Sequence, residues 1–138
     1  MSAAYEPMVG RYLRLTLGKL ACRVYVEEAG QGIPLICLHT AGADGRQYRH
    51  LLTDHEVTDR FRVIVFDMPW HGKSSPPEGW QDTDYQLTTA AYLEMVLALA
   101  DALALEQPVV MGCSIGGRAV LHLARLHGAR LGAVIGLQ

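Results

Sequence analysis

The chain has 138 residues, half of them hydrophobic, and its 14 acidic and 12 basic side chains give a net charge of −2. This length suits one hydrophobic core and is too short for two ordinary domains. The small net charge gives no electrostatic reason to expect nucleic acid or an anionic membrane as a partner, so a small, weakly polar ligand is the better expectation.

The first predicted elements form a β-hairpin. Residues 12–17 and 21–28 alternate apolar with polar side chains, and Gly18 and Lys19 separate the two segments. Such alternation is typical of strands that expose one face to water. We therefore expect an antiparallel hairpin at an edge of the sheet and outside its core.

Three later segments read as central strands. Residues 33–38, 61–66 and 108–111 are short apolar runs rich in valine and isoleucine. Strands covered on both faces have this composition, and both faces are covered in parallel sheets. We expect these three strands in the middle of a mostly parallel sheet.

Helical spacing occurs between and after these strands. It is weak at residues 44–52, clear at 83–105 and clear again from 115 to about 127. The alternation of strands and helices predicts a wound α/β fold with right-handed crossovers. Residues 131–137 look like one more strand, and because an uncovered apolar edge is an aggregation liability, we expect more chain to follow it.

One motif carries chemistry. The sequence Gly-x-Ser-x-Gly spans Gly112 to Gly116, directly after the apolar run 108–111 and before the last helical pattern. A serine on a tight strand-to-helix turn projects its hydroxyl above the sheet, and glycines leave room for the turn. Ser114 is the predicted nucleophile, and the Ile115 N–H at the helix start is the predicted oxyanion donor. The alternative is a glycine-rich turn that binds phosphate or only packs tightly.

Two further motifs make a family resemblance specific. Leu-His-Thr-Ala-Gly follows one central strand at residues 38–42, and Asp-Met-Pro-Trp-His-Gly-Lys-Ser follows the next at residues 67–74. With the Ser114 turn, these landmarks resemble the N-terminal half of the α/β-hydrolase fold family, from about Tyr12 to the last residue. The similar branch contains esterases, lactonases, carbon–carbon bond hydrolases and cofactor-free haloperoxidases.

The resemblance implies roles for the loop after the first central strand. It gives the second oxyanion donor as the Ala41 N–H and makes His39 a brace for the loop, not the catalytic base. This chain departs from the family by having Thr40 where glycine is common, and Ala41-Gly42 where a bulkier residue and proline are frequent. Residues expected to support the loop and the elbow are His39, Thr40, Gly42, Gly112, Gly116 and Gly117.

The resemblance also assigns the second landmark. Asp67 and the turn after it fix a loop near the site and perform no chemistry, and His71 receives no catalytic role. The family often has glycine at the position of Trp70. This tryptophan lines the substrate pocket in one interpretation and is a surface-packed aromatic in the other.

The implied enzyme is a serine hydrolase of the carboxylesterase and lactonase type. Ser114 attacks a carbonyl, the Ala41 and Ile115 amides hold the oxyanion, and water resolves an acyl-enzyme. The family order is serine, then acid, then histidine, so both partners are expected after residue 131. We therefore expect residues 1–138 to be the N-terminal part of a single core domain that lacks its cap and is nearly inactive alone.

Carboxylic esters and lactones, including acyl-homoserine lactones, are the leading substrates. Serine at the elbow argues against the dehalogenases and epoxide hydrolases that resemble this core but use aspartate. The alternatives are a carbon–carbon bond hydrolase, a perhydrolase-like haloperoxidase, and a receptor that binds a small ligand without turnover.

Neither a metal nor a cofactor is expected. The remaining histidines lack the spacing of a metal site, and the three cysteines lack a CxxC pair, so a disulfide framework is not expected. The first ten residues do not resemble a signal peptide, and no stretch approaches the roughly 18 continuous apolar residues of a membrane helix. We expect a cytoplasmic protein without a membrane partner, whose partners are its substrate and the rest of its own chain.

Overall fold

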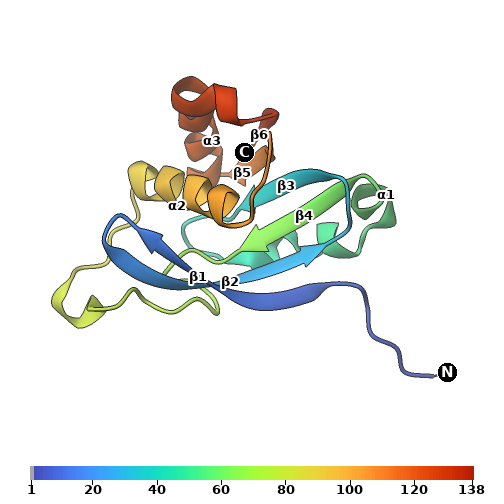
Figure 1. Ribbon diagram of the computed structural model, residues 1–138, viewed down its shortest axis with the longest axis horizontal. Coiled ribbons are helices and arrows are strands. Elements are labelled where there is room, and N and C mark those ends of the chain that lie inside the picture. Colours follow the sequence, from blue (N-terminus) through green and yellow to red (C-terminus); the bar gives the residue numbers. More distant parts are fainter. Residues whose placement is uncertain (1) are drawn as a thin grey trace.

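A six-stranded sheet runs through the computed structural model, which describes residues 2–138 (Figure 1). The strand order is β1-β2-β4-β3-β5-β6. The β1–β2 and β2–β4 pairs are antiparallel, and the other pairs are parallel. The bounds are Val9–Leu17 for β1, Leu20–Ala29 for β2, Ile33–Leu38 for β3, Phe61–Phe66 for β4, Val109–Cys113 for β5 and Ala133–Leu137 for β6. The predicted mostly parallel sheet with an antiparallel hairpin is confirmed.

The hairpin departs from its prediction in one respect. Strand β1 lies at the edge of the sheet, but β2 pairs with β4 on its other side and contributes the fully buried Val24 to the core. The prediction that the hairpin lies outside the core is therefore wrong for β2. The alternating pattern persists because only one face of β2 is covered, and its opposite face carries Arg23, paired with Arg14 of β1.

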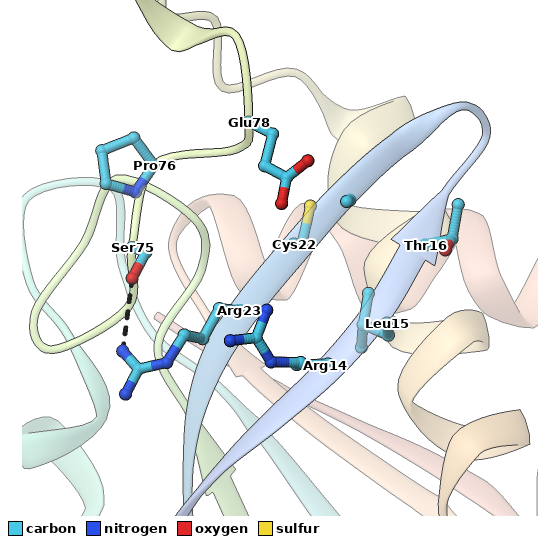
Figure 2. Close-up of a pocket in the computed structure, with 9 residues that line it drawn as sticks. Arg14, Leu15, Thr16, Cys22, Arg23, Ser75, Pro76 and Glu78 are labelled. Atoms are coloured by element: carbon cyan, nitrogen blue, oxygen red, sulfur yellow. Dashed lines mark hydrogen bonds between the residues drawn. The ribbon is translucent and has the colours of Figure 1, made fainter.

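Figure 2 shows Arg14 and Arg23 beside the loop of Ser75 and Pro76. These residues line an open pocket of about 330 Å³.

Both faces of the central strands are covered, which explains their unbroken apolar runs. Helices α2 (Thr89–Ala102) and α3 (Ile115–His127) pack on one face, where their apolar side chains meet those of β2, β3, β4 and β5 (Figure 1). The short elements η1 (Gly45–Tyr48), η2 (Leu51–Thr53) and α1 (His55–Thr58) cover the other face. No helix within residues 2–138 has the length and apolar character needed to cross a membrane.

Two helix predictions need correction. The pattern at residues 83–105 gives a helix only over Thr89–Ala102, because the Thr88 hydroxyl accepts a hydrogen bond from the Ala91 N–H and caps it there. Apolar side chains before and after α2 extend the pattern because they pack on the same core. The weak pattern at 44–52 forms the 3₁₀ turns η1 and η2. The two remaining short turns are η3 (Trp80–Asp82) and η4 (Gly128–Arg130).

The order of the strands places a crevice at one edge of the sheet. From β3 the chain passes to β4 on one side, and α2 then carries it to β5 on the other side of β3. The loops that leave the carboxyl ends of β3 and β5 thus diverge. Such a switch point is where open α/β sheets bind ligands.

Candidate active site

Ser114 stands at the turn between β5 and α3. Its backbone φ is 57°, in the left-handed region, and its side chain makes no hydrogen bond as a helix cap. The residue is exposed. A serine held in this strained conformation at a strand-to-helix turn presents its hydroxyl above the sheet, which is the geometry of a nucleophile elbow.

The glycines beside Ser114 are sterically required, because a side chain at these positions would clash with neighbouring backbone. A Cβ added to Gly112 would lie 2.3 Å from the carbonyl carbon of Gly116, and one added to Gly116 would lie 2.7 Å from the Leu38 oxygen. Gly117 is less tight, since its added Cβ would lie 3.1 Å from the Leu137 oxygen. The start of α3 can therefore pack directly against β5 and β3 only because Gly112 and Gly116 have no Cβ.

Two backbone N–H groups lie at this edge without a partner of their own. Ile115 is the first residue of α3, where the amide has no acceptor within the helix. Ala41 is exposed in the turn after β3, and none of residues 2–138 accepts a hydrogen bond from its N–H. Strands β3 and β5 are neighbours, with Leu38 opposite Gly112, so both amides leave adjacent strands at the same edge.

His39 is completely buried and uses both ring nitrogens. Its Nδ1 lies 2.7 Å from the Thr40 carbonyl, and its Nε2 accepts a hydrogen bond of 3.0 Å from the Met68 N–H. Nδ1 must therefore carry the proton, and burial lowers the pKa of the ring. A neutral imidazole with both nitrogens occupied is unavailable as a general base, and this geometry supports the bracing role.

The backbone around Ala41 is held from several sides. The Thr40 carbonyl also accepts from the Ala43 N–H, and the Thr40 N–H donates to Oε1 of Gln47 at 3.0 Å. Gly42 is exposed, and a Cβ added to it would meet open space, so its predicted supporting role has no steric basis. Hydrogen bonds on Thr40 hold the loop, and the supporting role of Gly42 stays a prediction.

Two buried tyrosines, which no sequence motif singles out, hold the end of β3. The Tyr48 hydroxyl donates to the Leu38 carbonyl at 2.8 Å, and the Tyr92 hydroxyl donates to the His39 carbonyl at 2.6 Å. Tyr48 belongs to η1 and Tyr92 to α2, on opposite faces of the sheet. In the sequence each is only one more apolar residue of a helical pattern.

Asp67 ties three segments together after β4. Its carboxylate accepts from the Gly45 N–H at 2.7 Å and from the Lys73 N–H at 2.8 Å. Its main-chain carbonyl accepts from the Ser74 hydroxyl, whose oxygen accepts from the Tyr25 N–H. These contacts hold the turn after β4 in place, and that Asp67 performs no chemistry stays a prediction.

Trp70 has a φ of 74°, which is unusual for a residue other than glycine and fits the family's preference for glycine here. Its ring packs edge-on against Trp80, with centroids 5.7 Å apart, and lies 5.6 Å from the Tyr85 ring. The indole lines a cavity of about 180 Å³ together with apolar residues of β1, β2 and the segment before α2. The structure thus puts Trp70 on a cavity wall, and that this cavity receives the substrate stays a prediction.

His71 was given no role from the sequence, yet it contacts the Ala41 loop. Its Nε2 lies 3.0 Å from the Ala41 carbonyl oxygen and 3.2 Å from the Tyr85 hydroxyl, and its Nδ1 lies 3.0 Å from the Pro69 carbonyl. No sequence signal marks this contact, because it joins two loops that are 30 residues apart.

A complete catalytic set is not present in the part of the chain that the structure describes. No histidine among residues 2–138 is hydrogen-bonded to a carboxylate, and no group of three or more His, Cys, Asp or Glu side chains there could hold a metal ion. The elbow and its two candidate donors are the chemical features that remain.

The fold and the elbow define the class of α/β hydrolases, and comparison with known proteins agrees. The family model described as "alpha/beta hydrolase fold" matches residues 33–138. The chain belongs to the α/β-hydrolase family.

Curated relatives include enzymes of several activities. The chain is 34% identical over 112 residues, 81% of this chain and 40% of the relative, to a pimeloyl-[acyl-carrier protein] methyl ester esterase of Aeromonas hydrophila. It is 32% identical, over 82% of this chain, to a protein of Mycobacterium phage D29 whose name places it with the non-heme haloperoxidases, and 30% identical, over 79%, to a 2-hydroxymuconate semialdehyde hydrolase of Pseudomonas sp. CF600. The chain spans about 40% of the length of these relatives.

Among solved structures, an epoxide hydrolase of Vigna radiata superposes with a TM-score of 0.78. The match covers 96% of this chain and 40% of the epoxide hydrolase, at 18% sequence identity. At this identity the likeness establishes the fold alone.

Proposed function

We propose that this chain provides the nucleophile half of a serine hydrolase that cleaves carboxylic esters or lactones through an acyl-enzyme on Ser114. The observation that carries the proposal is the elbow. It is an exposed serine at φ 57°, between Gly112 and Gly116, whose surroundings leave no room for a Cβ. Strained backbone conformations cluster at functional sites, which favours a chemical role for Ser114 over a turn that only packs.

The proposed reaction uses groups at the edge between β3 and β5. Ser114 Oγ attacks the carbonyl carbon, the negative oxygen is held by the Ala41 and Ile115 amides, and the alcohol leaves before water releases the acid. The proton of Ser114 needs a base. In this proposal the base and the acid that orients it come from outside residues 1–138, because His39 is buried with both nitrogens engaged.

Two other activities share the same nucleophile. The relatives named as a hydrolase of 2-hydroxymuconate semialdehyde and as a haloperoxidase support carbon–carbon bond hydrolysis and perhydrolase-like chemistry as alternatives. The pimeloyl methyl ester esterase supports the ester reading. We place esters and lactones first because the serine elbow and two backbone amides suffice for acyl transfer once a base is supplied.

The test begins with a fluorophosphonate probe on the purified natural protein. Intact-mass analysis should show one adduct, and peptide mapping should place it on Ser114. Ser114→Ala should abolish the adduct and lower hydrolysis of a short-chain p-nitrophenyl ester at least 10³-fold. Ser75→Ala, a serine of the loop beside the hairpin, is the matched control and should label normally.

A substrate panel then separates the alternatives. It contains the p-nitrophenyl ester, an acyl-homoserine lactone, a ring-cleavage diketone, and hydrogen peroxide with a halide and a halogen acceptor. Turnover of the diketone alone, or of the peroxide mixture alone, would replace the ester proposal. Tight binding of a ligand that is unchanged by Ser114→Ala, without turnover, would instead indicate a receptor.

A further inference from the structure

The His71 ring lies between two carbonyl oxygens. Its Nδ1 is 3.0 Å from the Pro69 oxygen, and its Nε2 is 3.0 Å from the Ala41 oxygen. A carbonyl oxygen only accepts hydrogen bonds, so each nitrogen must carry a proton to bond its neighbour. Both contacts exist together only when the ring is the doubly protonated imidazolium.

The carbonyl that His71 contacts belongs to the residue whose amide is the proposed oxyanion donor. Ala41 is flanked by two peptide planes. His39 holds the first through the Thr40 carbonyl, and His71 holds the second through the Ala41 carbonyl. Because the N–H of a trans peptide points away from its carbonyl, fixing the Thr40 carbonyl aims the Ala41 N–H, and fixing the Ala41 carbonyl keeps the residue from rotating.

We propose that His71, in its protonated form, is a positioning residue that holds Ala41 so that its N–H is ready for the oxyanion. The inference rests on the proposed function, since it assigns a task in the reaction at Ser114. His71 does not touch the reacting atoms, and it acts through the Ala41 backbone.

Tyr85 determines which contact is lost when the proton leaves. Its hydroxyl is 3.2 Å from Nε2 and can donate to that nitrogen once the nitrogen is bare. The neutral ring then keeps Nδ1–H on the Pro69 carbonyl and gives up the Ala41 carbonyl. The Trp70 ring packs against Tyr85 and keeps the phenol beside His71.

The charged and titratable groups around His71 come from several elements. His39, at the end of β3, has its ring centroid 4.9 Å away; it stays neutral because burial lowers its pKa, and repulsion from His71 acts in the same direction. The Asp67 carboxylate and the Asp44 Cβ lie beside the following residue, Gly72. Tyr85 lies beside the His71 ring, and the ammonium of Lys73, two residues after His71, lies over the Tyr25 ring.

The direction of the pH effect on Ser114 reactivity follows from the second proton of His71, which the contact with the Ala41 carbonyl needs. The hold on Ala41 is present while His71 is charged and is lost at higher pH, when its proton leaves. Loss of the hold lowers reactivity. The effect is therefore a descending limb on the alkaline side, opposite to the rise expected from a catalytic base.

The experiment measures the ring and the reaction separately on the natural protein. Long-range ¹H–¹⁵N NMR of the imidazole groups reports the protonation and tautomer of His71, assigned by its loss in His71→Gln. The rate constant for fluorophosphonate labelling of Ser114, measured from pH 5 to 9, should fall as His71 loses its proton.

His71→Gln should label about tenfold more slowly at the optimum pH, since small misplacements of catalytic groups have such effects. It should also lack the descending limb. His50→Gln, an exposed histidine without a capping bond, is the control and should behave as the natural protein.

The outcomes separate the two proposals. If the natural protein labels at Ser114 but its rate does not follow the His71 titration, or if His71→Gln retains both the rate and the descending limb, the positioning role is wrong and the hydrolase proposal stands. Absence of labelling in the natural protein overturns both. Should His71→Gln fail to fold by circular dichroism, the NMR and labelling profiles of the natural protein still decide.

Discussion

Gly116 is the second residue of α3, directly after the candidate nucleophile and its neighbour, and it lies close to the end of β3. The residue has no alternative there, because any Cβ would approach the Leu38 carbonyl. Ser114 shows the opposite case, since a side chain is present in a conformation that side chains rarely adopt. At the residue scale the elbow thus depends on the missing Cβ of Gly116 and on the strained backbone of Ser114.

The first prediction concerns Gly116→Ala. The new Cβ would lie 2.7 Å from the Leu38 oxygen and 2.9 Å from its Cβ, so β3 and α3 must separate. We expect a loss of about 1–3 kcal/mol in the free energy of unfolding, as for other overpacked sites. Urea denaturation measures it. Gly128→Ala is the control, because its φ is −55° and its added Cβ meets open space, and it should be neutral or slightly stabilising. Equal effects of the two substitutions would contradict the steric account.

The second prediction concerns the cysteines, all three of which are free thiols. Burial raises the pKa of the Cys37 thiol to about 12 and also raises the pKa of Cys22, so neither forms a reactive thiolate near neutral pH. Iodoacetamide at pH 8 should modify the half-buried Cys113 first in the native protein. Peptide mass mapping should find Cys22 and Cys37 modified only after denaturation, and early modification of Cys37 would show that β3 is less well covered.

At the element scale, the end of β3 is held by η1 and α2, which pack on opposite faces of the sheet. From the two faces of the sheet, the Tyr48 hydroxyl of η1 donates to the carbonyl of Leu38, the last residue of β3, and the Tyr92 hydroxyl of α2 donates to that of His39, the next residue. Burial raises the pKa of both phenols well above the ordinary value, so they remain donors. The loop after β3 therefore depends on elements that lie before and after β4 in the sequence.

The third prediction concerns the start of α2. Thr88 caps the helix by accepting from the Ala91 N–H at 3.1 Å. Thr88→Ala should lower the free energy of unfolding by about 1 kcal/mol, whereas Thr88→Ser, which keeps the hydroxyl, should cost much less. Thermal unfolding followed by circular dichroism tests this. An equal loss in both variants would mean that the methyl group, and not the cap, stabilises the helix start.

At the scale of the whole molecule, the edge of the sheet is assembled from loops that are held to one another. Asp67 connects the first residue of η1 with the turn after β4, and His71 connects that turn with Ala41. Asp44 and Arg46 form an ion pair at the start of η1. These links join segments that are distant in sequence, so the stability of the loop cluster depends on charge and hence on pH.

The fourth prediction follows from the Asp44 carboxyl. Hydrogen bonds from the Arg46 side chain lower its pKa to about 2. A carboxyl whose pKa is lower in the folded protein stabilises the fold above its unfolded pKa of about 3.9 and loses this contribution as the pH falls toward 2. Arg46→Gln should therefore destabilise the protein at pH 6 and should differ little from the natural protein at pH 2. Urea midpoints at both values measure this, with Arg125→Gln on α3 as the control. A difference that persists at pH 2 would show that Arg46 acts through packing.

Much of the fold is encoded in local patterns. The strands Ile33–Leu38 and Phe61–Phe66 and the helix Ile115–His127 have the bounds that the sequence predicted, because apolar periodicity and chain-breaking residues mark them directly. Gly112 and Gly116 around Ser114 are equally local, since a tight strand-to-helix turn needs small residues wherever it occurs. Local patterns were less reliable where the core is shared, as at residues 83–105, because loop side chains can fill the same apolar face as a helix.

The tertiary structure decided the contacts between loops. That β2 joins the core, that two tyrosines fix the end of β3, and that the His71 ring reaches the Ala41 carbonyl depend on which strands become neighbours. No periodicity encodes these contacts, because a hydrogen bond between distant loops constrains neither loop's own pattern. The sequence by itself determined the elbow and its central strands, and the folded structure alone determined how the loop facing Ser114 is held.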